Sequence, residues 1–220
     1  MSSKATPKPT GRAQQKAATR DSLKAAARAC FAEQGYAATQ IGDIARRAGV
    51  AHGTFYVHFP GKEQLTDELL AEYNQALLAR LERVWARSAG APLPERVHAL
   101  ADACLDRWAR ERELLAAIAE RAGATAALGT LREGVSPAVA TFLLDQLREV
   151  AVAAGLDDAA AELIVQALLG MWLRVGVRYV FGPRTSRRGA ADVLTRMSLG
   201  ALAGVVPALA ATVAAPGGPR

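Results

Sequence analysis

The sequence has few of the residues on which disulfide scaffolds, metal sites and most enzyme active sites depend. It contains two cysteines, Cys30 and Cys104, and three histidines, with no Cys-x-x-Cys or Cys/His spacing. This scarcity argues against a disulfide scaffold and a structural zinc site, and it fits a reducing, cytoplasmic location. GxSxG, HExxH, P-loop and Rossmann patterns are also absent. We therefore expect no metal, no cofactor and no enzyme activity.

Long apolar runs and aromatic residues are scarce as well. Aromatics make up 5% of the chain although 51% of its residues are apolar, so a core must be built mainly from Ala, Leu and Val. The chain does not open on an apolar stretch, and we expect no signal peptide. One uncharged run, residues 197–219, is long enough to span a bilayer. It is rich in Ala and Gly and interrupted by Pro207, so we expect a buried helix end and no membrane contact.

Positive charge is concentrated at the start of the chain. The net charge is +6, but residues 1–62 hold ten basic and three acidic side chains, and the remainder of the chain is near neutral. This asymmetry indicates a polyanion-binding module joined to a second module, with a merely solubilising basic tail as the alternative. Residues 1–18 have two prolines and almost no large apolar side chains, so we expect them to form a flexible basic arm.

Apolar residues at three- and four-residue spacing follow the arm and predict helices. The first is expected over residues 20–34, because Gly35 ends its pattern, and two short helices are expected over 40–48 and 52–59 around a turn at Gly49. Two short helices joined by a tight turn and braced by a third are typical of a helix-turn-helix unit.

The remainder of the chain is also predicted to be helical. A long amphipathic helix is expected to connect the two modules, and no alternating β-branched run occurs. The expected helices cover residues 62–88, 94–110, 111–122, 137–154, 157–181 and 188–211. The predicted fold class is therefore all-α, with an N-terminal three-helix helix-turn-helix domain joined by a long helix to a C-terminal helical domain.

Many positions around the helix-turn-helix follow a recognisable pattern at fixed spacing. They are Phe31, Gly35-Tyr36, Thr39, Ile44-Ala45, Ala48-Gly49-Val50, Gly53-Thr54, Tyr56, His58-Phe59 and Lys62-Glu63. Residues 19–65 thereby resemble the DNA-binding domain of the TetR (tetracycline-repressor) family of bacterial transcriptional regulators. The resemblance implies a DNA-binding domain over residues 19–63 and a helical ligand-binding and dimerisation domain over residues 64–215. The pattern departs from the family at Gly42, Ala51 and His52.

The short helix over residues 52–59 is the expected recognition helix, the helix that enters the major groove of DNA. Phe55 and Phe59 are expected to anchor it, leaving polar and short side chains to contact base edges in a major groove. Free backbone N–H groups at the start of the preceding helix can hold a phosphate oxygen. The candidate DNA-binding residues are Thr39, Gln40, His52, Gly53, Thr54, Tyr56, Val57, His58 and Lys62.

These candidates have different expected roles. The resemblance implies that Tyr56 and Lys62 contact phosphates. The residue types make His52, Thr54 and Val57 candidate base readers. Two alternatives remain open, in which Thr54 mainly begins the helix and His58 packs inside the domain.

For the C-terminal helices the resemblance implies a homodimer interface and a pocket for a small-molecule effector. A dimer is also expected physically, because one short helix reads too few base pairs, whereas two read a palindromic operator. The candidate interface residues are Leu163, Ala167, Gly170, Arg174, Gly200, Gly204 and Val205, with packing within one chain as the alternative. The candidate ligand-binding residues are Cys104, Trp108, Phe142, Gln146, Gln166, Met171 and Trp172, with an ordinary core role as the alternative for each.

The function that these features predict is sequence-specific DNA binding by a transcriptional regulator, a repressor released from its operator by a small molecule. An activator, or a regulator without a ligand, is the alternative within the same class. An enzyme is disfavoured by the missing motifs. A membrane-attached helical protein would have to use residues 197–219 as its anchor.

Overall fold

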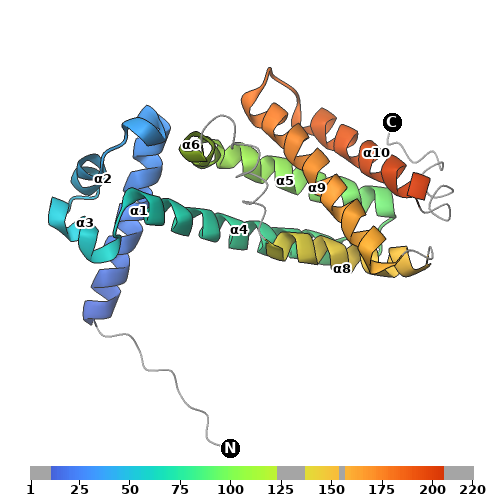
Figure 1. Ribbon diagram of the computed structural model, residues 1–220, viewed down its shortest axis with the longest axis horizontal. Coiled ribbons are helices and arrows are strands. Elements are labelled where there is room, and N and C mark those ends of the chain that lie inside the picture. Colours follow the sequence, from blue (N-terminus) through green and yellow to red (C-terminus); the bar gives the residue numbers. More distant parts are fainter. Residues whose placement is uncertain (1–10, 123–136, 154–156, 206–220) are drawn as a thin grey trace, which may run out of the picture. The chain divides into compact units, whose positions relative to one another are not determined.

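The computed structural model describes residues 11–122, 137–153 and 157–205, and these residues form helices joined by short turns (Figure 1). No strand occurs among them. The helices are α1 (Gly11–Ala38), α2 (Ile41–Arg47), α3 (His52–His58), α4 (Lys62–Arg87), α5 (Leu93–Arg110), α6 (Arg112–Ala122), α8 (Pro137–Ala153), α9 (Asp158–Phe181) and α10 (Arg187–Val205). The all-α prediction is confirmed, and the expected helices from α2 to α9 agree with the observed ones to within one residue at each end.

Helix α1 begins earlier than the sequence pattern predicted. Residues 11–18, which were expected to belong to a flexible arm, form its first two turns, while residues 1–10 lie outside the described residues. The physical reason is local: the segment is rich in Ala, Arg, Gln and Lys, which all favour helix. Its side chains are exposed, so this part of α1 continues the helix without adding to the core.

Two glycines set the bends of the helix-turn-helix. Gly35 interrupts α1 with φ 80°, and Gly49 follows α2 with φ 71°. Both values lie in the left-handed region that glycine adopts without steric cost. The helix ends predicted at these glycines are therefore confirmed, although one further helical turn, Tyr36–Ala38, follows Gly35.

The chain divides into two compact units, and the division does not follow the chain order. The first unit comprises α1, α2, α3, α4 as far as Ala71, and α6 from Glu113. The second comprises α4 from Glu72, α5, α8, α9 and α10. Helix α6, which the sequence had placed in the C-terminal domain, therefore groups with the helix-turn-helix.

The core of the first unit is formed by large apolar side chains from α1 to α4. Phe55 and Phe59 are fully buried, as predicted for the anchors of α3. Burial of side chains of this size contributes about 1.5–3 kcal/mol each relative to exposure. Other large buried residues of the first unit include Leu23, Phe31, Ile44, Leu65 and Leu69.

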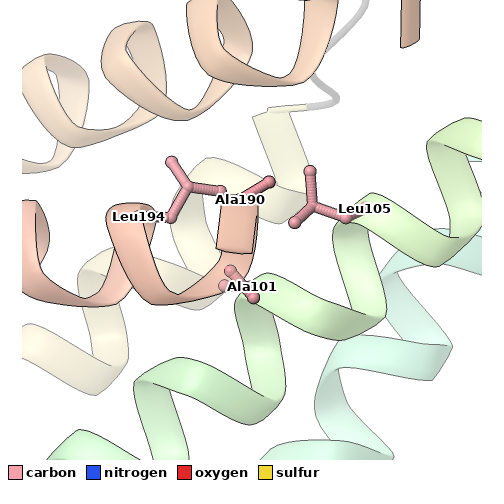
Figure 2. Packing of buried hydrophobic residues seen from close by; sticks show 5 residues of the cluster. Ala101, Leu105, Ala190 and Leu194 are labelled. Atoms are coloured by element: carbon pink, nitrogen blue, oxygen red, sulfur yellow. The ribbon is translucent and has the colours of Figure 1, made fainter. Parts of the chain in front are cut away.

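The core of the second unit is built around small residues. Ala101 and Leu105 of α5 pack against Ala190, Ala191 and Leu194 of α10 (Figure 2). Alanine at a helix contact lets two backbones approach closely. This alanine-rich packing is what the composition predicted.

A further close approach in the second unit involves Gly176 of α9 and Trp108 of α5. A Cβ placed on Gly176 would lie 1.9 Å from Cζ3 of Trp108, so any larger residue would displace the indole. Trp108 also packs, partly buried, against the core of this unit. Its ring therefore fills the contact between α5 and α9.

Helix α9 is unusually apolar for its exposure. It is long and apolar enough to cross a bilayer, with a mean hydropathy of 1.5, yet only 17% of its most apolar stretch is buried. One such helix is weak evidence for a membrane protein. In the run for which a buried helix end was expected, Ser198, Leu199 and Leu202 are buried, and residues 206–219 lie outside the described residues.

Candidate nucleic-acid interface and effector cavity

Helix α3 presents a continuous exposed surface. His52 and Gly53 are exposed, as are Tyr56 at 52% and Val57 at 67% of their surface. They stay exposed because Phe55 faces the core from the opposite side of the helix. The arrangement matches a recognition helix that can enter a major groove, with hydrogen-bonding and methyl groups facing outward.

Thr54 and Tyr56 are held more firmly than the other α3 residues. Thr54 is half-buried, and its N–H donates to the Ala51 carbonyl at 2.8 Å in the first turn, as a helix-start residue would. The Tyr56 ring lies between two edge-on neighbours, His52 and Phe55, each with its ring centroid 5.6 Å away. Tyr56 is therefore oriented by a buried ring on one side and an exposed ring on the other.

Thr39 does not lie where the phosphate hypothesis requires it. It is only 2% exposed, and its hydroxyl donates to the Gly35 carbonyl at 2.6 Å. A hydroxyl held in this way closes the bend in α1 at Gly35 and is turned away from solvent. The predicted phosphate contact of Thr39 therefore finds no support in this arrangement.

The residue at the start of α2 is Gln40, which is exposed and acts as the N-cap. Its backbone N–H donates to Oδ2 of Asp43 at 3.2 Å, so the reciprocal cap relies on an aspartate where Glu or Gln is usual. Gly42, two residues after Gln40 and inside α2, has open space where a side chain would project.

Lys62 has a structural role in this unit that the sequence did not predict. Its ammonium donates to the carbonyls of Tyr36 at 2.6 Å and Thr39 at 2.8 Å, and it lies 4.1 Å from the centre of the Tyr36 ring. Two of its three donors thus hold the segment between α1 and α2, which leaves one for a phosphate. The sequence reasoning missed this structural role, because the two carbonyls lie more than 20 residues away along the chain.

His58 lies half-buried at the end of α3. Its carbonyl accepts from Arg20, and its Nδ1 is buried with no hydrogen-bond partner among the described residues. Burial, followed by the positive charges of Lys16 and Arg20, lowers the pKa of the imidazole, which therefore stays neutral near pH 7. Packing inside the domain, the alternative considered from sequence, fits His58 better than contact with a base.

Basic side chains on α1 lie beside the end of α3. Arg12, Lys16 and Arg20 occur at four-residue intervals, which places them on one face of the helix. Arg20 is fixed by Glu68, with Nε donating to Oε1 at 3.0 Å, and its guanidinium lies 4.1 Å from the centre of the Phe59 ring. Arg12 and Lys16 are exposed. Because α1 begins at Gly11, Arg12 and Lys16 lie on the same face of the helix as Arg20.

Two charged side chains of α6 explain why this helix groups with the first unit. The Glu120 carboxylate accepts from the backbone N–H groups of Tyr36 at 2.7 Å and Ala37 at 3.1 Å, directly after the bend in α1. Arg121 donates to Asp67 at 2.6 Å. Such contacts cannot be read from periodicity, because they join segments more than 50 residues apart.

The second unit contains a cavity of about 410 Å³, within the size range of small-molecule sites. Of the seven predicted ligand-binding residues, Gln146 and Trp172 line it. The residues that complete its lining are Trp85, Leu93, Arg96, Val97, Leu100, Leu143, Asp145, Val165, Leu168, Leu169, Ser198 and Leu202. Trp85 and Arg96 were missed because each lies on a helix stripe that looks like ordinary surface or packing.

The other five predicted ligand-binding residues do not line this cavity. Cys104 is buried in α5, where burial raises the pKa of its thiol to about 12, and Trp108 packs against Gly176. Gln166 is exposed and lines a separate groove. Phe142 and Met171 are half-buried away from the cavity lining. This cavity therefore gives no support to ligand contact at these five positions. Helical spacing shows which residues share a face, not what that face contacts.

The predicted interface residues on α9 and α10 are exposed. Leu163 is 72% exposed, and Ala167, Gly170, Arg174, Gly200 and Gly204 are also exposed. The side chain of Val205 lies outside the described residues. Packing within one chain, the alternative, therefore does not account for these positions. Other large apolar side chains exposed on the same two helices are Phe181, Val193 and Met197.

Comparison with known proteins shows what the helix-turn-helix segment is similar to. A sequence profile described as "Bacterial regulatory proteins, tetR family" matches residues 23–69. The chain is 39% identical over 70 residues to the HTH-type transcriptional repressor KstR2 of Mycolicibacterium smegmatis, covering 32% of this chain and 34% of that protein. It is 40% identical over 52 residues to the fatty acid metabolism regulator protein of Bacillus subtilis, covering 24% and 27%. The match thus spans about a third or less of these curated relatives.

Solved structures resemble the chain over most of its length. The fatty acid degradation regulator FadR of Bacillus halodurans has a TM-score of 0.63 at 19% identity, covering 90% of this chain and 98% of that one. RolR in complex with its ligand resorcinol has a TM-score of 0.57 at 19% identity, covering 93% and 97%. At these identities the likeness shows a shared all-α fold.

Proposed function

We propose that this chain is a cytoplasmic transcriptional repressor of the TetR family, to which its helix-turn-helix segment is similar, and that it binds operator DNA in a sequence-specific manner. The observation that carries the proposal is the exposed surface of α3, where His52, Tyr56 and Val57 project from a helix anchored by buried phenylalanines. The excess positive charge of the first 62 residues supplies attraction to phosphates. Repression is also the function named for the KstR2 relatives.

The DNA-bound form in this proposal is a homodimer. The support is the exposed apolar face of α9 and α10, which includes Leu163 at 72% and Met197 at 49% exposure. Soluble proteins rarely leave a large apolar face uncovered, and small residues such as Gly170 and Gly200 let helices of two copies approach closely. Two copies would read the two halves of a palindromic operator.

Release by a small molecule is the regulatory part of the proposal. The support is the mostly apolar cavity of about 410 Å³ in the second unit, together with the resorcinol complex of RolR, which has the same fold. An effector releases the operator only to the extent that it binds the DNA-incompetent state more tightly than the DNA-bound state.

The test begins with selection of the operator from a random DNA library by the full chain. We expect a palindromic sequence that binds two copies of the chain, and a plot of log affinity against log salt with a slope of several units, about 0.9 for each neutralised phosphate. The double substitution Arg12→Ala/Lys16→Ala should lower that slope without changing the selected sequence, because these side chains would contribute charge to phosphate binding and read no base. A slope near zero, or no enriched sequence, would contradict DNA recognition.

A further inference from the structure

We propose that the cavity of the second unit takes a monoanionic amphipath, a molecule with an apolar body and one carboxylate, and that Arg96 receives the carboxylate. The inference rests on the proposed function, because it names the chemistry of the effector. It depends on the mostly apolar lining of the cavity and on Arg96, which lies in that lining without an ion pair to a described residue.

The walls of the cavity are apolar on several helices. Val97 and Leu100 come from α5, and Val165, Leu168 and Leu169 come from α9. Two indoles, those of Trp85 and Trp172, add flat apolar surface. Such walls favour a hydrocarbon or aromatic body over a sugar or a nucleotide.

Five side chains with polar groups, besides the Trp85 indole, interrupt these walls, and three of them already have partners. The Trp172 indole N–H donates to the Ser198 hydroxyl at 2.8 Å, so the indole is satisfied within the protein. Asp145 is exposed and takes part in another interaction. Arg96 and Gln146 remain as the groups that can orient a ligand.

Arg96 differs from those arginines of the second unit that form ion pairs. Arg80, Arg110 and Arg187 all bind Asp106, and Arg107 binds Glu111. The Arg96 guanidinium instead lies 3.5 Å from the centre of the Trp85 ring and has no ion pair with a described residue. Its Nε is buried and has no hydrogen-bond partner among the described residues, as is also the case for Arg80 and Arg107.

An arginine in this state fits a carboxylate. Its planar fork of N–H groups donates to two carboxylate oxygens side by side, and the indole beneath it keeps the fork in place. Because Arg96 is the single cation in the cavity lining, which also contains the Asp145 carboxylate, a phosphate ester with two negative charges is disfavoured. A cationic ligand would face Arg96 directly and be repelled.

The test uses the full chain and three probes that differ only in headgroup: decanoate, 1-decanol and decyltrimethylammonium. Trp85 and Trp172 line the cavity, so saturable changes in tryptophan fluorescence report occupancy. We expect decanoate to bind at least about tenfold more tightly than the other two, the size of a charged hydrogen bond. Equal binding of decanoate and decanol, or a preference for the ammonium, would overturn the proposal.

Two substitutions locate the headgroup. Arg96→Gln should weaken decanoate binding by about tenfold or more and change decanol binding by less than about twofold. Arg83→Gln, an exposed arginine outside the cavity lining, is the matched control and should change neither. If Arg96→Gln and Arg83→Gln give the same affinities, Arg96 does not receive the carboxylate. Because the wild-type comparison of probes needs no variant, a folding defect in Arg96→Gln leaves the test intact.

Failure of the carboxylate site at Arg96 can be distinguished from failure of the proposed function. Operator affinity is measured by fluorescence anisotropy with and without decanoate. Arg96-dependent binding of decanoate that leaves operator affinity unchanged would refute release by this ligand while confirming the site. Normal operator binding with no preference for the carboxylate would refute the site and leave the DNA-binding function standing.

Discussion

The two units of the chain use charged side chains in different ways. In the first, ion pairs such as Arg20–Glu68 occur, but Lys62 and Glu120 bind backbone carbonyls and N–H groups around the bend in α1 at Gly35. In the second, Asp106 accepts from Arg80, Arg110 and Arg187, so charges pair with one another between α4, α5 and α10. The first arrangement fixes the path of the backbone beside the recognition helix. The second ties three helices together around one carboxylate.

The exposed faces of the units differ as well. The first exposes polar and short side chains on α3, with cations nearby on α1. The second exposes an apolar face on α9 and α10, where Leu163 is 72% exposed. In the proposed function this difference corresponds to different partners, a hydrated polyanion for the first unit and an apolar surface for the second.

The largest expected effect comes from removing the carboxylate on which the second unit depends. Asp106→Asn leaves three guanidinium groups without their shared acceptor, and breaking a buried pair costs about 3–5 kcal/mol. Because the three arginines are partly exposed, we expect the free energy of unfolding to fall by about 2–3 kcal/mol. All three tryptophans lie in the second unit, so urea unfolding followed by their fluorescence measures it.

Glu162→Gln, an exposed carboxylate on α9, serves as the control for Asp106→Asn. It should shift the urea midpoint very little, because surface charges contribute about 0–1 kcal/mol. Equal shifts in the two variants would show that Asp106 does not hold the second unit together.

The same carboxylate predicts a pH dependence. The hydrogen bond from Arg110 and the charges of the three arginines outweigh burial and hold the pKa of Asp106 below its ordinary value. A carboxyl with a lowered folded pKa stabilises the protein above its unfolded pKa of about 4 and stops doing so as pH falls through the folded value. The stability difference between wild type and Asp106→Asn should therefore be full at pH 7 and shrink below about pH 4. A difference that grew on acidification would contradict this assignment.

A smaller effect is expected in the first unit from Lys62→Met, which keeps the apolar stem and removes the donors. Loss of two bonds to carbonyls should destabilise the segment between α1 and α2 by about 1–2 kcal/mol. Amide hydrogen exchange of residues 36–41 measures this change, and operator affinity should fall with it. Tyr56→Phe should weaken operator binding with no change in exchange. If Lys62→Met behaves like Tyr56→Phe, Lys62 serves DNA contact alone.

The smallest effect on stability is expected on the exposed surface of α3. His52→Ala removes an exposed ring and should change the free energy of unfolding by less than about 0.5 kcal/mol. It should nevertheless alter the selected operator sequence, because His52 faces outward from the recognition helix. An unchanged sequence preference would remove His52 from the base-reading residues.

Much of the fold was predictable because its signals are local. Helical spacing and the punctuating Gly35 and Gly49 gave the helices of the first unit, and the same spacing gave α4 to α9. The start of α1 was misjudged because a polar sequence with good helix propensity has no apolar stripe to reveal it.

The candidate sites were less predictable. Exposed α3 positions followed from the position of Phe55, since residues on the far side of a short anchored helix must face outward. Thr39 and Lys62 could not be placed, because their partners are backbone atoms brought near by the bend at Gly35. The cavity lining was mostly missed, because five helices contribute to it.

The sequence by itself determined the all-α class, the helix-turn-helix, the position of the positive charge and the exposed surface of α3. Each of these depends on residues within a few turns of one another, where helical periodicity and glycine conformation decide the outcome. Only the tertiary structure decided that α6 joins the first unit, that Asp106 gathers three arginines and that Arg96 faces a cavity without an ion pair among the described residues. These features depend on contacts between distant segments, and spacing along one helix carries no information about which partner a face will meet.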